Sequence, residues 1–298
     1  MPFKTTLDNL EDIAENISDL MEHLLLNYSS LYFWNTTLEF VFIISPDGNY
    51  AFRKLNQEGR QIQSRLSDEY RKFYSILTCL LRQQSEDSLN TLKREDEHIM
   101  SIIEQRITWH KDTREALNQS QKGLDIQLNL LKRLYDYSES NPTFVPDTKA
   151  LLYNHILEDW KFPDTTRFTI ALTPPVLEEL NELKYNRIDD NIRNKAESLI
   201  NQYNEYGRRG KITEGITLVN GASKLLSMAS EPNMNEAMSW LDQNSKCDRF
   251  LASFIELTRI RPHSPVILVT RDINMQNNAK FNCVAFIEPP ESIDRSDP

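Results

Sequence analysis

Residues 266–274 read VILVTRDIN, a run of apolar residues that ends at an arginine and an acid and passes into a polar segment. The apolar run predicts a β-strand, and Asp272 follows it directly. In open α/β sheets, sites form at the carboxyl ends of the strands. We therefore expect the Asp272 side chain to lie at the functional edge of a sheet.

The chain around this stretch alternates between two kinds of segment. Three short β-rich runs, Phe168–Leu172, Val266–Thr270 and Val284–Ile287, alternate with helical stretches at 174–185, 190–207, 234–243 and 248–259. Strands that alternate with helices are typical of an α/β layer with a parallel sheet. We therefore predict this fold class for the C-terminal half.

Three further acids occupy comparable places. Asp147 follows an extended segment, Phe144 to Pro146, and precedes a helix around Leu151–Ile156. Glu179 lies in the opening turns of a helix that Thr173 caps, although its neighbour Glu178 is an alternative, and Asp248 opens another helix. Glu179 and Asp248 also have a purely structural explanation, since an acid near a helix N-terminus is favourable by about 0.3–1 kcal/mol. For Asp147 and Asp272 the structural alternative is an ordinary turn residue after a strand. Only their joint occurrence favours a site.

The first half of the chain is helical in pattern. Apolar residues recur at steps of three and four in three stretches, 7–24, 62–81 and 117–134, which predicts an all-α helical bundle or a coiled coil. The turn signal Ser45-Pro46-Asp47-Gly48 lies between Phe40–Ile44 and Tyr50–Phe52, so a small hairpin is an alternative there. Polar residues followed by Pro142 mark a boundary. We predict two domains, residues 1–142 and 143–298.

Composition excludes several classes of function. The formal net charge is −10 and there are only 7 glycines, which disfavours a dedicated duplex-DNA binder and a glycine-rich nucleotide loop. The three cysteines are far apart, and the five histidines show no paired ligand spacing, so neither a disulfide framework nor a zinc knuckle is expected. No apolar stretch approaches the roughly 18 residues of a membrane span. We expect a soluble cytoplasmic protein.

Four blocks of residues resemble the PIN-domain nucleases, bacterial-type PIN domains in particular. They occur in the order of that family and cover about half of the chain, which here adds an N-terminal helical extension. The blocks are Val145-Pro146-Asp147-Thr148, Thr173-Pro174-Pro175-Val176-Leu177-Glu178-Glu179-Leu180, Asp248-Arg249-x-Leu251-Ala252, and Val269-Thr270-Arg271-Asp272-Ile273-Asn274.

The resemblance implies a site and an activity. Asp147, Glu179, Asp248 and Asp272 would form a catalytic acidic cluster that binds Mg²⁺ or Mn²⁺, with Thr148, Thr270 and Asn274 as supporting residues. The family cleaves mostly single-stranded or structured RNA and leaves a 5′-phosphate and a 3′-hydroxyl. The chemistry is consistent with these residues, because clustered carboxylates repel one another unless a cation neutralises them, and hard oxygen ligands suit Mg²⁺ or Mn²⁺. One ion or two would serve.

One residue in this site departs from the family pattern. Lys149 stands where the family commonly carries asparagine, and a lysine there can pair with a carboxylate, which would weaken metal binding or replace part of the metal's charge. Residues 277–278 are Asn-Asn, where related sequences often have a basic residue second. Neither departure removes an acid.

The sequence offers four basic residues as candidates for contact with RNA phosphates. The stretch 184–224 has more basic than acidic residues, and it includes Arg208, Arg209 and Lys211. These three have the alternative role of capping a helix C-terminus. Arg271, beside Asp272, is the fourth candidate for contact with the nucleic acid.

The leading hypothesis is a Mg²⁺- or Mn²⁺-dependent endoribonuclease whose helical N-terminal half regulates it or assembles it, through self-association or a protein partner. A toxin or defence role belongs to the family, but no sequence feature points to it. A rival is a catalytically silent PIN module that binds RNA or a protein partner, which Lys149 would favour. A third reading, a DNA-directed structure-specific nuclease, is disfavoured by the acidic balance.

Overall fold

The computed structural model of this chain describes residues 3–33, 50–106, 108–137, 141–185, 189–234, 237–238 and 240–291. The chain divides into two compact units, which we call the helical unit, Leu10–Leu134, and the sheet unit, Met1–Asn9 together with Tyr135–Pro298. The sheet unit thus takes up residues 1–9, which the predicted boundary at residue 142 assigns to the helical half. The division into domains at that boundary stays a prediction.

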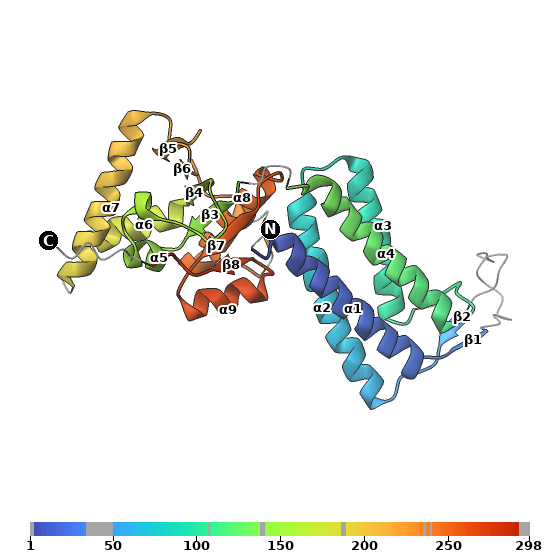
Figure 1. Ribbon diagram of the computed structural model, residues 1–298. Coiled ribbons are helices and arrows are strands. Elements are labelled where there is room, and N and C mark those ends of the chain that lie inside the picture. The colour runs from blue at the N-terminus through green and yellow to red at the C-terminus, as the bar shows by residue number, and fades with distance from the viewer. Residues whose placement is uncertain are drawn as a thin grey trace. The chain divides into compact units, whose positions relative to one another are not determined.

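Four helices build the helical unit (Figure 1). They are α1 Thr6–Asn27, whose first residues belong to the sheet unit, α2 Gln57–Leu81, α3 Glu86–Ile103 and α4 Thr113–Leu134. The predicted apolar stripes are the buried faces of α1, α2 and α4; Leu10, Ile17 and Leu24 of α1, for example, are at most 1% exposed. The helix α3 was not among the predicted stripes. It begins after Ser85, whose hydroxyl accepts a hydrogen bond from the Ser88 N–H.

A small antiparallel ribbon accompanies these helices. Strand β1, Leu31–Phe33, pairs with β2, Tyr50–Phe52. The hairpin predicted around Ser45–Gly48 used Phe40–Ile44 as its first strand, and these residues lie outside the described part of the chain. The second predicted strand of that hairpin, Tyr50–Phe52, is confirmed.

Two histidines meet in the helical unit. The Nε2 atoms of His98 in α3 and His110 before α4 lie 3.1 Å apart, and His110 is only 1% exposed. Their spacing in the chain is not a ligand pattern, so the sequence offered no sign of this pair. Burial lowers the pKa of both imidazoles.

The sheet unit is built on a six-stranded sheet with the order β5-β6-β4-β3-β7-β8. Only the β5–β6 pair is antiparallel. Every residue of β3 and β7 is buried, as expected for central strands of a parallel sheet. The strands are β3 Thr143–Pro146, β4 Phe168–Leu172, β5 Ile216–Val219, β6 Ser223–Ser227, β7 Val266–Val269 and β8 Phe286–Ile287.

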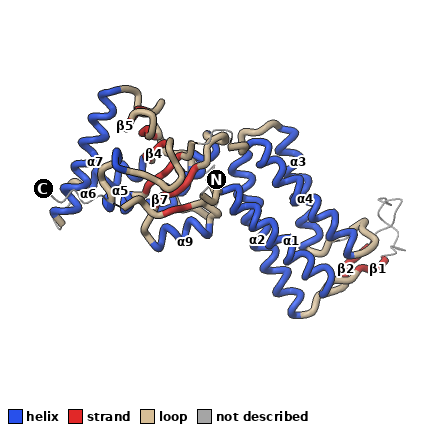
Figure 2. The backbone as a smooth tube through the Cα atoms, in the orientation of Figure 1, coloured by secondary structure: helices blue, strands red, loops and turns tan. Residues whose placement is uncertain are grey.

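Helices connect these strands, and in Figure 2 the red strands β4 and β7 lie between the blue helices α7 and α9. The connecting elements are α5 Thr148–Tyr153, the short 3₁₀ helix η1 Leu157–Asp159, α6 Pro174–Leu183, α7 Asp190–Arg209, α8 Lys246–Ile260 and α9 Ile273–Phe281. The predicted class is confirmed: an α/β domain with a largely parallel sheet, preceded by a helical part.

Two details of the sheet unit differ from the prediction. Residues 234–243 were expected to be helical, but the described residues among them form turns instead, in which the Trp240 indole donates to Asn282. The strands β5 and β6 were not predicted. They are short and partly exposed, and Gly221 in their connecting turn has a positive φ of 75°. Among the described residues, none of the helices is long and apolar enough to cross a membrane.

Candidate active site

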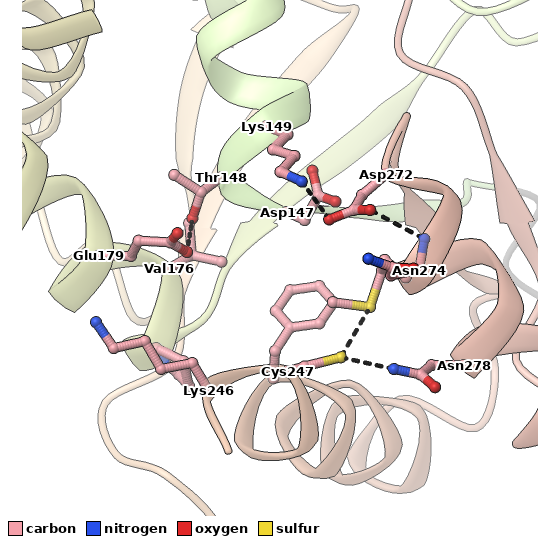
Figure 3. Close-up of a pocket in the computed structure, with 13 residues that line it drawn as sticks. Asp147, Thr148, Lys149, Val176, Glu179, Lys246, Cys247, Asp272, Asn274 and Asn278 are labelled. Carbon is pink, nitrogen blue, oxygen red and sulfur yellow. Dashed lines mark hydrogen bonds and ion pairs between the residues drawn. The ribbon is translucent and has the colours of Figure 1, made fainter. Parts of the chain in front are cut away.

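Three acids from three separate segments line one cavity. Asp147 follows β3, Asp272 follows β7, and Glu179 lies in α6, the helix after β4. Because β3 lies between β4 and β7 in the sheet, the ends of these strands bring the acids to one edge. The cavity, of about 300 Å³, is shown in Figure 3 and is called the acidic cavity below; its lining is Asp147, Thr148, Lys149, Pro175, Val176, Glu179, Lys246, Cys247, Phe250, Asp272, Asn274, Met275 and Asn278.

Asp147 is the most deeply buried of the three acids, with 6% exposure. It is the N-cap of α5, where its Oδ1 accepts a hydrogen bond of 2.7 Å from the Ala150 N–H, while the Thr270 hydroxyl donates to its Oδ2. Burial raises the pKa of the Asp147 carboxyl, and the two hydrogen bonds oppose this rise only in part. A nearby cation would therefore be favourable here.

Asp272 is held in the opposite electrostatic state by Lys149. The Lys149 Nζ lies 2.5 Å from Asp272 Oδ2, and the backbone N–H of Asn274 donates to Oδ1 at 2.9 Å. The hydrogen bond from Lys149 holds the pKa of the Asp272 carboxyl below its usual value, and it raises the pKa of the Lys149 ammonium in turn. The pairing with a carboxylate that the sequence suggested for Lys149 is thus present (Figure 3).

Glu179 and its neighbour Glu178 have different surroundings. Its carboxylate accepts a hydrogen bond of 2.6 Å from the Thr148 hydroxyl and lines the acidic cavity. Glu178 does not line the cavity, and it forms an ion pair of 2.6 Å with Arg249. The hydroxyls of Thr148 and Thr270 and the backbone N–H of Asn274 each donate a hydrogen bond to one of the three acids, and the supporting role of these residues stays a prediction.

Asp248, the fourth acid of the predicted cluster, has different contacts. It is not among the residues that line the acidic cavity, and its Oδ2 accepts a hydrogen bond of 3.0 Å from the Asp242 N–H. Helix α8 begins two residues earlier than predicted, because Ser245 is its N-cap and accepts a hydrogen bond from the Asp248 N–H. The assignment of Asp248 to the acidic cluster stays a prediction, which this arrangement does not support.

Two residues of this helix start were missed by the sequence reading. Lys246 and Cys247 both line the acidic cavity, and Lys246 forms an ion pair with Glu182. The Cys247 thiol accepts a hydrogen bond of 3.0 Å from the Asn278 amide, and burial raises the pKa of this thiol. Cys247 therefore lines the cavity as a neutral thiol and not as a thiolate nucleophile. Ser245 as an N-cap was the signal that would have placed both residues.

The four basic residues proposed to contact RNA do not line the acidic cavity. Arg208 and Arg209 lie in the last turn of α7, where Arg209 pairs with Glu205, and Lys211 pairs with Glu214 at 2.9 Å. The Arg271 guanidinium lies 4.0 Å from the centre of the Tyr153 ring. A role in binding nucleic acid stays a prediction for all four.

The oxygen ligands that the acidic cavity offers are of the type that binds a hard divalent cation. Carboxylate oxygens of Asp147, Glu179 and Asp272 are ligands that Mg²⁺ and Mn²⁺ prefer. Among the described residues, however, no three acidic, histidine or cysteine side chains come close enough together to hold one ion. One of the three acids, Asp272, is already paired with the Lys149 ammonium.

Comparison with known proteins agrees with this geometry. A family model described as a PIN domain matches residues 144–287, which run from β3 to the end of β8 and include all three acids of the cavity. No curated protein matches the chain. Residues 144–287 of the chain therefore form a PIN domain, which has a nuclease-type fold.

Proposed function

We propose that the chain is a Mg²⁺- or Mn²⁺-dependent endoribonuclease that hydrolyses RNA phosphodiester bonds at the acidic cavity. The observation that carries this proposal is the convergence of Asp147, Glu179 and Asp272, from three segments, on one cavity at the strand ends of a PIN domain. A net charge of −10 further favours short single-stranded or structured RNA over long duplex DNA as the substrate.

The three acids would hold the ion, and the surrounding hydrogen bonds would hold the acids. A bound divalent ion supplies a coordinated water of lowered pKa and neutralises negative charge on the phosphate. Thr270 and the Ala150 N–H fix both oxygens of Asp147, and Thr148 fixes Glu179. These donors orient the carboxylates before any ion arrives, which reduces the reorganisation that binding requires.

Lys149 would contribute the second positive charge of the site. Its ammonium faces Asp272 and also interacts electrostatically with Asp147 and Glu179. A cation at this place balances part of the negative charge of the acids and lies where a phosphate oxygen of a substrate would approach them. A lysine in the cavity is therefore compatible with cleavage. It would lower the affinity for the metal ion, because the ammonium and the ion repel each other.

A second candidate function rests on the same lysine. The ion pair of Lys149 with Asp272 at 2.5 Å neutralises one acid without a metal, which favours a catalytically silent PIN module that binds RNA or a protein partner. The two candidates differ in one measurable property, since only the first requires a divalent ion for its effect on RNA.

The helical unit is proposed to regulate or assemble the nuclease. This proposal is supported by three large aromatic side chains that the unit exposes, Tyr32, Phe33 and Trp109, at 43%, 57% and 56% exposure. Exposed aromatic side chains of this kind are enriched at protein interfaces. Light scattering of the full chain and of its Phe33→Ser variant would measure self-association, which we expect the substitution to reduce.

A cleavage assay tests the leading proposal. Short single-stranded RNA and DNA of one sequence are incubated with the full chain in Mn²⁺, in Mg²⁺ or in EDTA, and the products are resolved on a gel. We expect metal-dependent cleavage of RNA, reduced at least about 100-fold in Asp147→Asn and Asp272→Asn. Asp189→Asn is the matched control, because Asp189 also caps a helix but lies outside the acidic cavity. Cleavage that persists in both site variants would show that the site is elsewhere, and RNA binding without cleavage would favour the silent module.

A further inference from the structure

A second cavity, of about 440 Å³, lies in the sheet unit and shares no lining residue with the acidic cavity. It is formed at the starts of β4 and β6, beside β5 and the residue that follows α8. The acidic cavity lies at the opposite, carboxyl ends of the parallel strands. With five residues in β4 at about 3.3 Å each, roughly 15 Å of strand separates the two edges.

Positive charge gathers around this second cavity, which we call the cationic cavity. Arg167, Lys224 and Arg261 line it, and Glu214 is the single carboxylate among the described lining residues. Glu214 is itself paired with Lys211 at 2.9 Å. Among the described residues, no carboxylate forms an ion pair with any of the three cations. The chain as a whole is acidic, with a net charge of −10, so a cavity whose described lining carries three cations without an ion-pair partner differs from the chain's overall charge.

Arg261 is the residue whose environment calls most clearly for a ligand. Its Nε is buried and has no hydrogen-bond partner among the described residues. The backbone of Arg261 caps the end of α8, where its N–H donates to the Leu257 carbonyl at 3.1 Å. A cation at a helix C-terminus is favourable and explains the position of the charge. It does not explain a buried donor without an acceptor, which is costly to a folded protein.

The rest of the lining is consistent with a polar, anionic ligand. Thr169 and Lys224 are paired across β4 and β6, so the sheet fixes the backbone position of Lys224 beside the cavity. Gly215 and Gly221 both have positive φ, at 93° and 75°, and leave backbone without side chains along the wall. A volume of about 440 Å³ lies within the range of small-ligand sites.

We infer that the cationic cavity binds a phosphate group, carried by a nucleotide or by a nucleic-acid strand. The guanidinium groups of Arg261 and Arg167 would supply directional hydrogen bonds, and the Lys224 ammonium would supply a point charge. Three cations match the charge of a phosphate better than the single charge of a carboxylate. The inference does not rest on cleavage at the acidic cavity.

Amide NMR of the full chain tests this inference at the residues concerned. The amide signals of Gly215 and Gly221 are followed while inorganic phosphate, a 5′-mononucleotide or a short single-stranded RNA is added, with EDTA present so that no divalent ion reaches the acidic cavity. We expect saturable shifts at both glycines. The affinity should fall about tenfold in Arg261→Gln, which removes the buried donor, and about threefold in Lys224→Gln.

The control and the outcomes separate the sources of the phosphate. Lys161→Gln removes one exposed cation from the same unit outside the cavity and should leave the affinity unchanged. Saturation by inorganic phosphate and mononucleotide supports a terminal phosphate as the ligand, and saturation by RNA alone supports a backbone phosphodiester. The absence of saturable shifts with all three probes would overturn the inference. So would equal affinities in the parent and in Lys224→Gln, an exposed strand residue whose change leaves the fold intact.

Discussion

At the scale of single residues, the acidic cavity sets two carboxyls in opposite electrostatic states. Burial raises the pKa of Asp147, while Lys149 lowers the pKa of Asp272. Neighbouring groups whose pKa values are shifted in opposite directions are typical of functional sites, although structural ion pairs also shift pKa values. The sequence placed both acids at strand ends, but the partner of each depended on the fold.

Replacement of Lys149 by asparagine should strengthen metal binding. The Lys149 ammonium competes with a divalent ion for Asp272, and its removal frees that carboxylate and removes a like charge from the cavity. We expect Mn²⁺ to bind at least about tenfold more tightly to Lys149→Asn than to the parent. Free Mn²⁺ measured by electron paramagnetic resonance gives the affinity. Lys149→Arg keeps the charge and is the control; equal affinities in all three proteins would remove Lys149 from the account of the site.

Replacement of Asp147 by asparagine should stabilise the metal-free protein. The folded-state pKa of Asp147 is raised above its unfolded value, so its charged form costs stability at pH 7, and asparagine keeps the N-cap hydrogen bond of α5. We expect the free energy of unfolding in EDTA to rise by about 1 kcal/mol at pH 7, a gain that fades as the pH falls through the unfolded-state pKa of about 3.9, below which the carboxyl is protonated in both states. Urea unfolding measures it. A lower stability than that of the matched Asp189→Asn variant would contradict this explanation.

At the scale of elements, the sequence predicted those with strong patterns and missed those with weak ones. The strands β4 and β7 and the helices α6 and α7 were expected within a few residues, because apolar runs and caps mark them clearly. The strands β5 and β6 have no such run, since both lie toward one side of the sheet and are partly exposed. Helix α8 was expected, but its early start at Lys246 was not, because the N-cap residue Ser245 was not recognised in the sequence.

The histidine pair gives the helical unit a dependence on pH. One Nε2 must donate and the other accept, so His98 and His110 bond to each other as neutral rings. Burial lowers both pKa values below the unfolded value of about 6.5, while Glu95, Asp112 and Glu115 oppose this in part. Protons therefore bind more readily to the unfolded state. The full contribution to stability is present above about pH 6.5 and is lost as the pH falls toward the folded-state pKa values.

Circular dichroism during thermal unfolding measures this dependence. The melting temperature of the parent should fall between pH 7 and pH 5.5, and the fall should be smaller in His110→Gln, which removes one titrating ring. His23→Gln changes an exposed histidine of the same unit and should keep the slope of the parent. A slope in His110→Gln as steep as that of the parent would show that other groups cause the acid sensitivity.

At the scale of the whole molecule, the chain joins a PIN domain to a helical unit that the family match does not include. The fold class and the edge of the sheet at which the acidic cavity lies were predictable, because hydrophobic period and strand ends are local signals. The histidine pair, the cationic cavity and the place of Asp248 were not. They depend on which distant segments the topology brings together, and no spacing in the sequence encodes this.

The claim on which the account depends is that the acidic cavity holds a divalent cation. Titration calorimetry of the full chain with Mn²⁺ tests it directly, alongside Asp147→Asn, Asp248→Asn and the matched Asp189→Asn. We predict that the parent and Asp189→Asn bind Mn²⁺ equally, that Asp147→Asn binds at least about tenfold more weakly, and that Asp248→Asn loses less affinity than Asp147→Asn. A parent protein that binds no Mn²⁺, or an Asp147→Asn variant that binds it as tightly as the parent, would contradict the claim.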